Sequence, residues 1–295
     1  MSPIFSRNFT CYGVNRFSKG LFKKVCIANT AGALAIPLLN GEINSLSIVG
    51  AWLSIILFSL QIYFDFSGYS DMAIGLGKMF GFHYHENFKH PYTAKSISDF
   101  WRRWHISLSS FFKDYVYIPL GGNKHNQIRN ILVVWSLTGL WHGASWNFII
   151  WGALHGIALG IHKIWMMMTG KAFARFNNSK LYNFIMIVLT FHFACFCWIF
   201  FKAEDFDIAL AMIRQIAFNF DFSVWMPFYE NYKYVVWMIV FAMLIHFIPD
   251  DFIDKLVEKR NKFSLGLYIL IFFAFLILYG FFKSSEQVMP IYLQF

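Results

Sequence analysis

Charged residues are scarce in this chain. Only 14% of its 295 residues are Asp, Glu, Lys or Arg, whereas 58% are hydrophobic and 21% are aromatic. A soluble domain usually carries about 25% charged residues and about 45–50% apolar ones. The composition excludes a disordered chain. It also excludes a water-soluble globule, which could not hide so much apolar surface. We therefore expect an all-α protein whose helices cross a membrane several times.

Cysteine is scarce as well. None of the four cysteines forms a CxxC pair, so we expect no disulfide framework. The stretch HYHENFKH (83–90) gathers three His and one Glu, but its spacing matches no standard zinc motif, and we expect no metal site. Acidic residues number 16 against 25 Lys and Arg, which gives a net charge of +9. In a membrane protein this excess is typical of basic cytoplasmic loops rather than of nucleic-acid binding.

Apolar runs mark the candidate membrane spans, because a spanning helix needs about 20 apolar residues. Three runs are strong candidates because they contain no charged residue over most of this length, and two others are shorter or interrupted by Gly and Pro. The strong runs are Ile43–Phe64, Leu181–Phe201 and Ser264–Phe282, and the weaker ones are Tyr234–Pro249 and Val25–Gly41.

The segment Asn130–His162 is too long for one span. It holds no acidic residue, Lys or Arg, and as one straight helix it would be about 50 Å long against a membrane core of about 30 Å. Its middle reads GLWHGAS (139–145), which is rich in small and polar residues. Irregular backbone at membrane depth occurs where it faces protein or a wet cavity. We therefore expect a broken or hairpin pair of helices, with His142 deep in the membrane.

The distribution of basic residues supports the hairpin. If the hairpin returns the chain to its starting side, that side holds 21 of the 25 Lys and Arg residues. A single crossing would instead scatter the basic loops over both faces. The positive-inside rule then places the basic face in the cytoplasm.

The stretch 96–117 (SISDFWRRWHISLSSFFKDYVY) predicts an interfacial amphipathic helix. Its apolar residues recur at the i, i+3/i+4, i+7 spacing of one helix face. Arg102 and Arg103 take the other face, where Asp99 and Arg103 can pair at i,i+4. A helix rich in Trp and Arg is typical of the membrane interface.

The segment Phe64–Gly81 is too rich in glycine and charge for a free span, and we expect a buried or re-entrant element there. It includes Asp65 and Asp71, and buried carboxylates need partners. We favour structural ion pairs for both, with Arg102 or Arg103 available as the cation.

The histidines in the apolar runs are the strongest candidates for functional residues, because ionisable residues inside a membrane usually serve a function. His142 stands out since Gly143, Ala144 and Ser145 follow it and leave room for a substrate. His105 becomes interesting only if the hairpin brings it towards His142. For the span residues His192 and His246 we favour a structural role, such as a hydrogen bond between helices.

Four long stretches carry a more specific pattern, and they are QIYFDFSGYSDMAIGLGKMFGF (61–82), ENFKHPY (86–92), FWRRWHISLSSFFKDYVYIPLGGN (100–123) and GLWHGASWNFIIWGALHG (139–156). In this order they resemble the membrane-bound O-acyltransferase (MBOAT) family. The branch resembled is that of bacterial alginate O-acetylation proteins and peptidoglycan O-acetyltransferases, with teichoic acid D-alanyl transfer proteins as more distant relatives. The resemblance covers most of residues 17–295.

The resemblance implies a single MBOAT-like transmembrane domain over residues 1–295, in the inner membrane of a bacterium. Members usually have a further membrane region ahead of the matched segment, so this chain looks like the C-terminal part of a longer protein. The family's catalytic histidine, in its WHG stretch, maps onto His142. A second histidine, in the WRRWH stretch, maps onto His105.

The implied reaction passes an acyl group, most simply acetyl, from a cytoplasmic thioester to hydroxyl groups of an extracytoplasmic polysaccharide. The donor expected is acetyl-CoA or an acyl-carrier thioester, with no permanently bound cofactor. A neutral buried His142 would act as general base. Relatives of this branch work with a separate extracytoplasmic acetyltransferase, for which the acidic outer loop 203–231 is a possible docking site.

Other residues are candidates for binding or orienting the substrates. Trp141, Ser145 and Asn147 could stabilise an oxyanion. Arg102, Arg103, Lys89 and Lys95 could attract an anionic carrier. Asp65 and Asn87 complete the candidate set.

Two other classes of function remain open on the residues alone. An electron carrier is possible because His142 and His155 lie near the spacing used for stacked haems, although neither the His192 nor the His246 helix supplies a matching pair. A transporter without bond chemistry is the second class. An inactive fragment of an acyltransferase is a further alternative.

Overall fold

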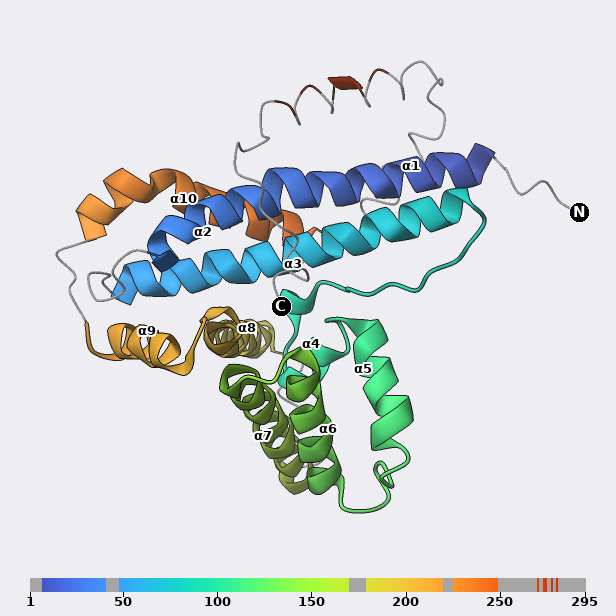
Figure 1. Ribbon diagram of the computed structural model, residues 1–295, viewed down its shortest axis with the longest axis vertical. Helices are drawn as coiled ribbons and strands as arrows, with labels where there is room; N and C mark the ends of the chain where they lie inside the picture. Colours follow the sequence, from blue (N-terminus) through green and yellow to red (C-terminus); the bar gives the residue numbers. More distant parts are fainter. Residues whose placement is uncertain are drawn as a thin grey trace, which may run out of the picture. The chain divides into compact units, whose positions relative to one another are not determined.

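The computed structural model describes residues 7–40, 48–169, 179–219 and 225–248, together with five positions between 270 and 280 (Figure 1). These residues form helices, turns and loops, and the described part of the chain contains no strand. The prediction of an all-α fold is confirmed. The chain divides into two compact units. Unit 1 comprises residues 1–86 and 221–294, and unit 2 comprises residues 87–220 with the terminal Phe295.

Three helices in the described part of the chain are long and apolar enough to cross a membrane, namely Val49–Met79, Trp146–Thr169 and Lys180–Lys202. Residues 49–64 of the predicted span Ile43–Phe64 fall in the first helix, and Leu181–Phe201 falls in the third. Residues 234–247 of the predicted span Tyr234–Pro249 fall in a helix whose apolar part, Val236–Phe247, is shorter than a span. The predicted span Ser264–Phe282 lies outside the described residues except at five helical positions.

In unit 1 the helices lie alongside one another (Figure 1). They are α1 (Arg7–Phe22), a π-helical turn (Lys23–Ala28), α2 (Asn29–Asn40), α3 (Ile48–Met79) and α10 (Trp225–Phe247). The predicted span Val25–Gly41 falls on the π turn and α2, a stretch that is not among the three long apolar helices. Glycines allow α1 and α3 to touch along their backbones. A Cβ atom added at Gly20 would lie 2.4 Å from the carbonyl oxygen of Gly68.

Of the two alternatives predicted for Phe64–Gly81, a buried or a re-entrant element, the re-entrant one is wrong, because α3 continues without a break as far as Met79. The expectation of burial is met, with Asp65 5% and Asp71 3% exposed. The two carboxylates that made a long helix improbable, those of Asp65 and Asp71, are paired with cations of α1 and of the π-helical turn after it. Asp71 pairs with Arg16 at 2.6 Å and Lys23 at 2.7 Å, and Asp65 pairs with Lys24. The ion pairs are thus confirmed, but their cations are not Arg102 or Arg103.

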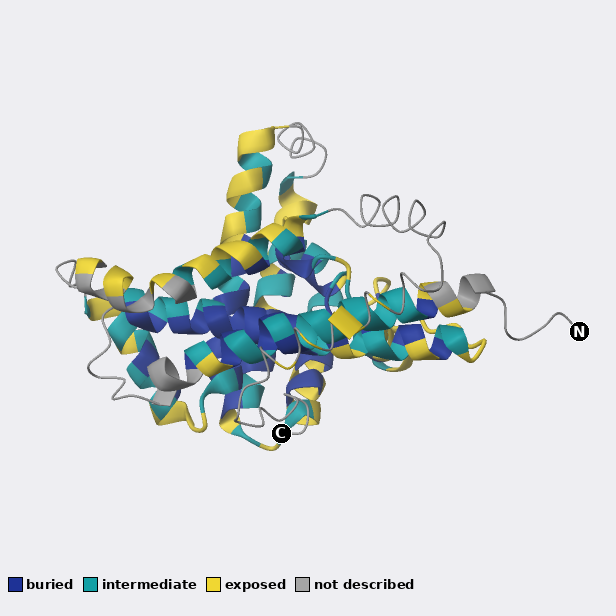
Figure 2. Cartoon of the chain, turned by 90° about the horizontal axis from the view of Figure 1, so that it is seen from above, coloured by how far each residue is buried: buried dark blue, intermediate teal, exposed yellow. Residues whose placement is uncertain are grey.

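Unit 2 holds the remaining helices. They are a 3-10 turn (Pro91–Thr93), α4 (Ile97–Trp101), α5 (Ile106–Phe112), a π-helical turn (Lys113–Tyr117), α6 (Gln127–His142), α7 (Trp146–Thr169), α8 (Lys180–Lys202) and α9 (Phe206–Phe218). Large apolar side chains lie exposed along α7 and α8, including Ile161 at 62% and Leu181 at 69%. Figure 2 shows exposed residues in yellow. Exposed apolar surface of this kind is suited to contact with lipid.

The predicted hairpin is confirmed. Helix α6 ends at His142, residues 143–145 form the break, and α7 begins at Trp146 and packs against α6. Glycine makes the contact close, since a Cβ atom added at Gly139 would lie 2.4 Å from the carbonyl oxygen of Phe148. At Gly152 the corresponding distance is 2.4 Å to the carbonyl oxygen of Trp135. Backbone contact at these two glycines fixes how the helices align.

The prediction of one amphipathic helix over 96–117 is wrong, because the structure divides this stretch into α4, α5 and a π turn. The break lies at residues 102–105, and His105 has a left-handed backbone with φ of +43°. The segment 87–89 supplies hydrogen bonds here: Lys89 N donates to Arg103 O at 2.9 Å, and Ile106 N donates to Asn87 O at 3.0 Å. These bonds replace those that a continuous helix would form.

Replacing Gly152 by Ala should destabilise the hairpin, because the new methyl group would collide with the carbonyl oxygen of Trp135. Overpacking of this kind costs about 1–3 kcal/mol. We expect a lower midpoint of thermal unfolding for the detergent-solubilised protein. Gly160→Ala is the matched control on the same helix, because the nearest atom to its Cβ would be Ile128 Cγ2 at 3.7 Å. Equal midpoints for the two variants would show that the close contact contributes no stability.

Candidate active site at the turn between α6 and α7

The turn that carries His142 is held between two helix ends. His142 is the last residue of α6, and Gly143 closes the helix by donating its N–H to Leu140 O at 3.2 Å. Ser145 Oγ accepts a hydrogen bond from Asn147 N at 3.2 Å, just before α7 begins. Asn147 is 3% exposed, and its Nδ2 donates to Ala203 O, at the end of α8, over 2.8 Å. The turn is therefore fixed to α8 as well as to its own two helices.

Aromatic rings surround the imidazole of His142. The rings of Trp151 and Phe201 meet it edge-on, each with a centroid distance of 5.0 Å. Trp141 lies at 4.9 Å and Phe148 at 6.1 Å. Among the residues that the structure describes, no hydrogen bond is made to either ring nitrogen of His142. Among the described residues, the contacts that position this ring are those of the aromatic side chains around it.

His105 is held by Asn87, a residue of the candidate set. Nδ1 of His105 lies 3.3 Å from Asn87 Oδ1. The same oxygen accepts hydrogen bonds from Ser107 N and Ser107 Oγ, each at 3.0 Å. Nδ1 of His105 also lies 3.3 Å from Ser107 Oγ, so Asn87 and Ser107 together orient the ring. An N–H on Nδ1 would donate to Asn87 Oδ1, because an amide oxygen can only accept.

The two predicted histidines lie in one neighbourhood. Burial lowers the pKa of His105 to about 3, and the nearby His142 adds to the effect. The hairpin thus meets the condition that made His105 interesting, namely proximity to His142. A pKa this low means that His105 is neutral throughout the physiological pH range.

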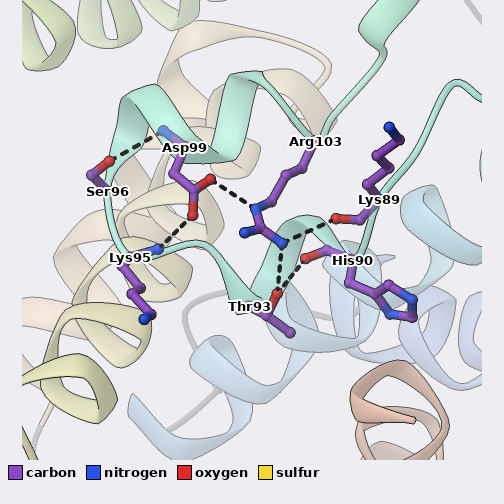
Figure 3. Close-up of polar contacts among 7 residues, drawn as sticks. All are labelled: Lys89, His90, Thr93, Lys95, Ser96, Asp99 and Arg103. Carbon is purple, nitrogen blue, oxygen red and sulfur yellow. Dashed lines mark hydrogen bonds and ion pairs between the residues drawn. The ribbon is translucent and has the colours of Figure 1, made fainter. Parts of the chain in front are cut away.

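Arg103 stabilises the loop that precedes His105 (Figure 3). Its Nε donates to Asp99 Oδ1 at 2.8 Å, which confirms the predicted i,i+4 pair. The guanidinium also donates to Thr93 Oγ1 at 3.3 Å and to Lys89 O at 3.5 Å. Ser96 Oγ, the cap of α4, accepts from Asp99 N at 3.1 Å. Arg103 therefore joins three short segments, while Arg102 is exposed.

The remaining candidate residues from the sequence lie in both units. Trp141 lies next to His142 and is 53% exposed. Ser145 caps α7, and Asn147 ties α7 to α8, so both support the turn. Asp65 belongs to unit 1, where it pairs with Lys24. Roles in substrate binding stay predictions for all of them.

Sequence reasoning missed Trp151 and Trp198, and it considered His155 only as a haem ligand. His155 is 1% exposed, and its Nδ1 accepts a hydrogen bond from Trp101 Nε1 at 3.2 Å. Trp151 touches both His155 and His142, with centroid distances of 4.9 and 5.0 Å. Trp198 of α8 stacks on Trp151 at 6.0 Å. The i,i+4 spacing of Trp151 and His155 could have placed them on one face of α7.

An apolar cavity of about 180 Å³ lies on the other side of these rings. Its wall includes Trp101 and Trp135, which also contact His155, and Lys113 and Tyr117 supply polar groups. Neither His142 nor His105 lines this cavity.

The sequence was compared with known proteins. A family model described as MBOAT, membrane-bound O-acyltransferase family, matches residues 42–203. The chain belongs to this family. The match includes the hairpin, His105 and His142.

Named relatives fall in the branches expected from the sequence. The chain is 45% identical over 205 residues to a peptidoglycan O-acetyltransferase of Helicobacter pylori, covering 68% of this chain and 38% of that protein. It is 44% identical over 220 residues to the "Probable alginate O-acetylase AlgI" of Pseudomonas putida, covering 72% and 42%. It is 30% identical over 207 residues to a teichoic acid D-alanyltransferase of Bacillus subtilis, covering 66% and 51%.

The chain spans less than half the length of the first two relatives. Membership of the MBOAT family favours the acyltransferase interpretation over an electron carrier or a transporter. The prediction of family and branch is confirmed.

The pH dependence of thermal stability tests whether burial lowers the pKa of His105 in the folded protein. Its folded pKa of about 3 lies below the unfolded value near 6.5, so the unfolded chain binds more protons between these values and stability falls as the pH is lowered from about 6.5. His105→Gln removes this group. We expect a shallower dependence of the thermal midpoint on pH between 6.5 and 4 than in the wild type. An unchanged slope would show that His105 already carries a proton in the folded protein.

Proposed function

We propose that this chain supplies the catalytic histidine of an O-acyltransferase, which passes an acyl group from a thioester across the membrane towards hydroxyl groups of a polysaccharide outside the cell. The observation that carries the proposal is the placement of His142. It sits at the helix break that precedes the apolar helix α7, and no described residue hydrogen-bonds its ring. A packed imidazole with free nitrogens is suited to general-base catalysis.

In the proposed reaction the acceptor hydroxyl attacks the carbonyl carbon of the thioester. His142 takes the hydroxyl proton as the new C–O bond forms. The carbon–sulfur bond then breaks, and the thiolate leaves and recovers the proton. Acetyl is the acyl group that agrees with the names of the O-acetylating relatives. General-base catalysis of this kind contributes about 10²–10⁴-fold to the rate.

Exposed cations in unit 2 support an anionic donor such as acetyl-CoA or an acyl-carrier protein. Lys89, Lys95 and Arg102 are exposed, whereas Arg103 is engaged by Asp99 and the neighbouring loop. Charges of one sign raise the local concentration of an oppositely charged ligand. The proposed route runs from this basic side, in the cytoplasm, to an acceptor on the outer side of the bacterial inner membrane.

An extracytoplasmic acetyltransferase would receive the acyl group from this protein and complete its transfer to the glycan. We propose that it docks on the acidic segment 203–231. There α9 begins at Phe206 with Asp205 as its cap, and Phe218 at its end is 82% exposed. Residues 220–224 lie outside the described part of the chain.

His142→Ala should abolish O-acetylation of the cell-surface polysaccharide while leaving the protein in the membrane. The measurement is acetate released by mild base from purified polysaccharide, with an immunoblot of the membrane fraction. His192→Ala is the matched control, because it removes a half-buried histidine of α8 in the same unit. Normal acetylation by a stably inserted His142→Ala variant would contradict the proposal.

A further inference from the structure

Four polar atoms on α7 and α8 are buried and have no hydrogen-bond partner among the described residues. They are Trp151 Nε1, His155 Nε2, Trp198 Nε1 and Asn147 Oδ1. Each side chain is at most 3% exposed. Buried polar groups in native structures are nearly always paired, so a group of unpaired ones needs an explanation. A polar ligand that enters this place would satisfy them.

Ring contacts place the side chains that carry the three nitrogen atoms in one cluster, with Trp151 in contact with the other two rings. Trp151 meets His142 at a centroid distance of 5.0 Å, His155 at 4.9 Å and Trp198 at 6.0 Å. Trp198 also touches Phe201, which itself meets His142 at 5.0 Å. The unpaired nitrogens therefore belong to the same cluster of rings as the proposed base.

All three nitrogens are hydrogen-bond donors. An indole nitrogen can only donate. In His155, Nδ1 accepts the N–H of Trp101 at 3.2 Å, so it carries no hydrogen. A neutral His155 must then carry its proton on Nε2. Trp101 thus fixes His155 in the tautomer that presents a donor.

We propose that the N–H groups of Trp151, Trp198 and His155 form the pocket that receives the carbonyl oxygen of the acyl donor. This inference rests on the proposed acyl transfer. When the acceptor hydroxyl attacks and His142 takes its proton, the electron pair of the C=O bond moves onto this oxygen. The N–H groups stabilise the resulting oxyanion. When the pair returns, the carbon–sulfur bond breaks and the thiolate leaves.

This assignment differs from what the sequence suggested. Trp141 is 53% exposed, and an exposed donor in contact with solvent stabilises an oxyanion less than a buried one. Ser145 is half-buried, its Oγ accepts a hydrogen bond from Asn147 N, and it is not among the buried unpaired groups. Asn147 has a donor engaged by Ala203 O, and its unpaired atom is an acceptor. Asn147 Oδ1 is instead suited to hold the acceptor hydroxyl before it is deprotonated.

The decisive change removes an N–H group and keeps the shape of the ring. β-(3-Benzothienyl)alanine has a sulfur atom in place of the indole N–H, and it would be incorporated at position 151 or 198 of the full-length protein. Removing one oxyanion donor typically lowers kcat by about 10²–10³-fold. We expect a loss of this size in acetyl transfer from acetyl-CoA. The KM for acetyl-CoA should change little, since the oxyanion exists only in the transition state.

The same replacement at Trp135 is the control. Trp135 packs in the same cluster, 6.0 Å from Trp151, but its nitrogen is not among the buried unpaired atoms. We expect the Trp135 variant to retain kcat within about twofold, a size typical of a change without an effect on the transition state. Equal losses at all three positions, or no loss at 151 and 198, would overturn the assignment.

A second readout needs no turnover. The probe is the ketone analogue of acetyl-CoA, in which a methylene group replaces the thioester sulfur, with ¹³C at the carbonyl. Hydrogen bonds from the pocket should shift the carbonyl infrared band of the bound analogue to lower frequency in the wild type. The shift should shrink in the Trp151 and Trp198 variants and persist in the Trp135 variant.

The two readouts separate the possible failures. If the wild type transfers no acetyl group but shows the Trp151-dependent infrared shift, the proposed function fails and the carbonyl pocket stands. If the wild type transfers acetyl groups but the band does not shift, the pocket is wrong and the acyltransferase stands. Absence of both transfer and shift would overturn both.

Discussion

Backbone contact between α6 and α7 is the constraint on which the candidate site depends. Gly139 and Gly152 have no side chain to separate the two helices, so each packs against the backbone of the other. This contact forces the chain to reverse within residues 143–145 and leaves His142 at the point of reversal. Asn147 then joins the turn to the end of α8. The side chain that we propose as the base is thus placed by backbone packing, and no described residue hydrogen-bonds its ring.

A second set of contacts fixes the segment that carries His105. Residues 102–105 interrupt the amphipathic stretch. Lys89 N donates a hydrogen bond to Arg103 O, and Asn87 O accepts one from Ile106 N. The side chain of Arg103 also bonds Asp99 and Thr93. The result is a left-handed His105 whose Nδ1 faces Asn87. One histidine is therefore oriented by a side-chain partner and the other by aromatic rings. Two neutral imidazoles in different surroundings can take different parts in proton transfer.

Local sequence was enough to predict what depends on local properties. The absence of charge over Asn130–His162 and the small residues at its centre predicted the hairpin, and the spacing of Asp99 and Arg103 predicted their ion pair. The break at His105 was not predictable in this way, because the bonds that stabilise it come from Asn87 and Lys89. The uninterrupted α3 depends on cations of another helix. The unpaired donors of Trp151 and Trp198 appear only after α7 and α8 pack together.

The most direct measurement of the central claim is a cryo-electron microscopy map of the whole protein in a lipid nanodisc with the ketone analogue of acetyl-CoA bound. The account predicts density for the carbonyl group between the ring of His142 and the indoles of Trp151 and Trp198. A map in which the ring of residue 142 faces lipid tails, or in which protein walls it off from the bound analogue, would contradict the account.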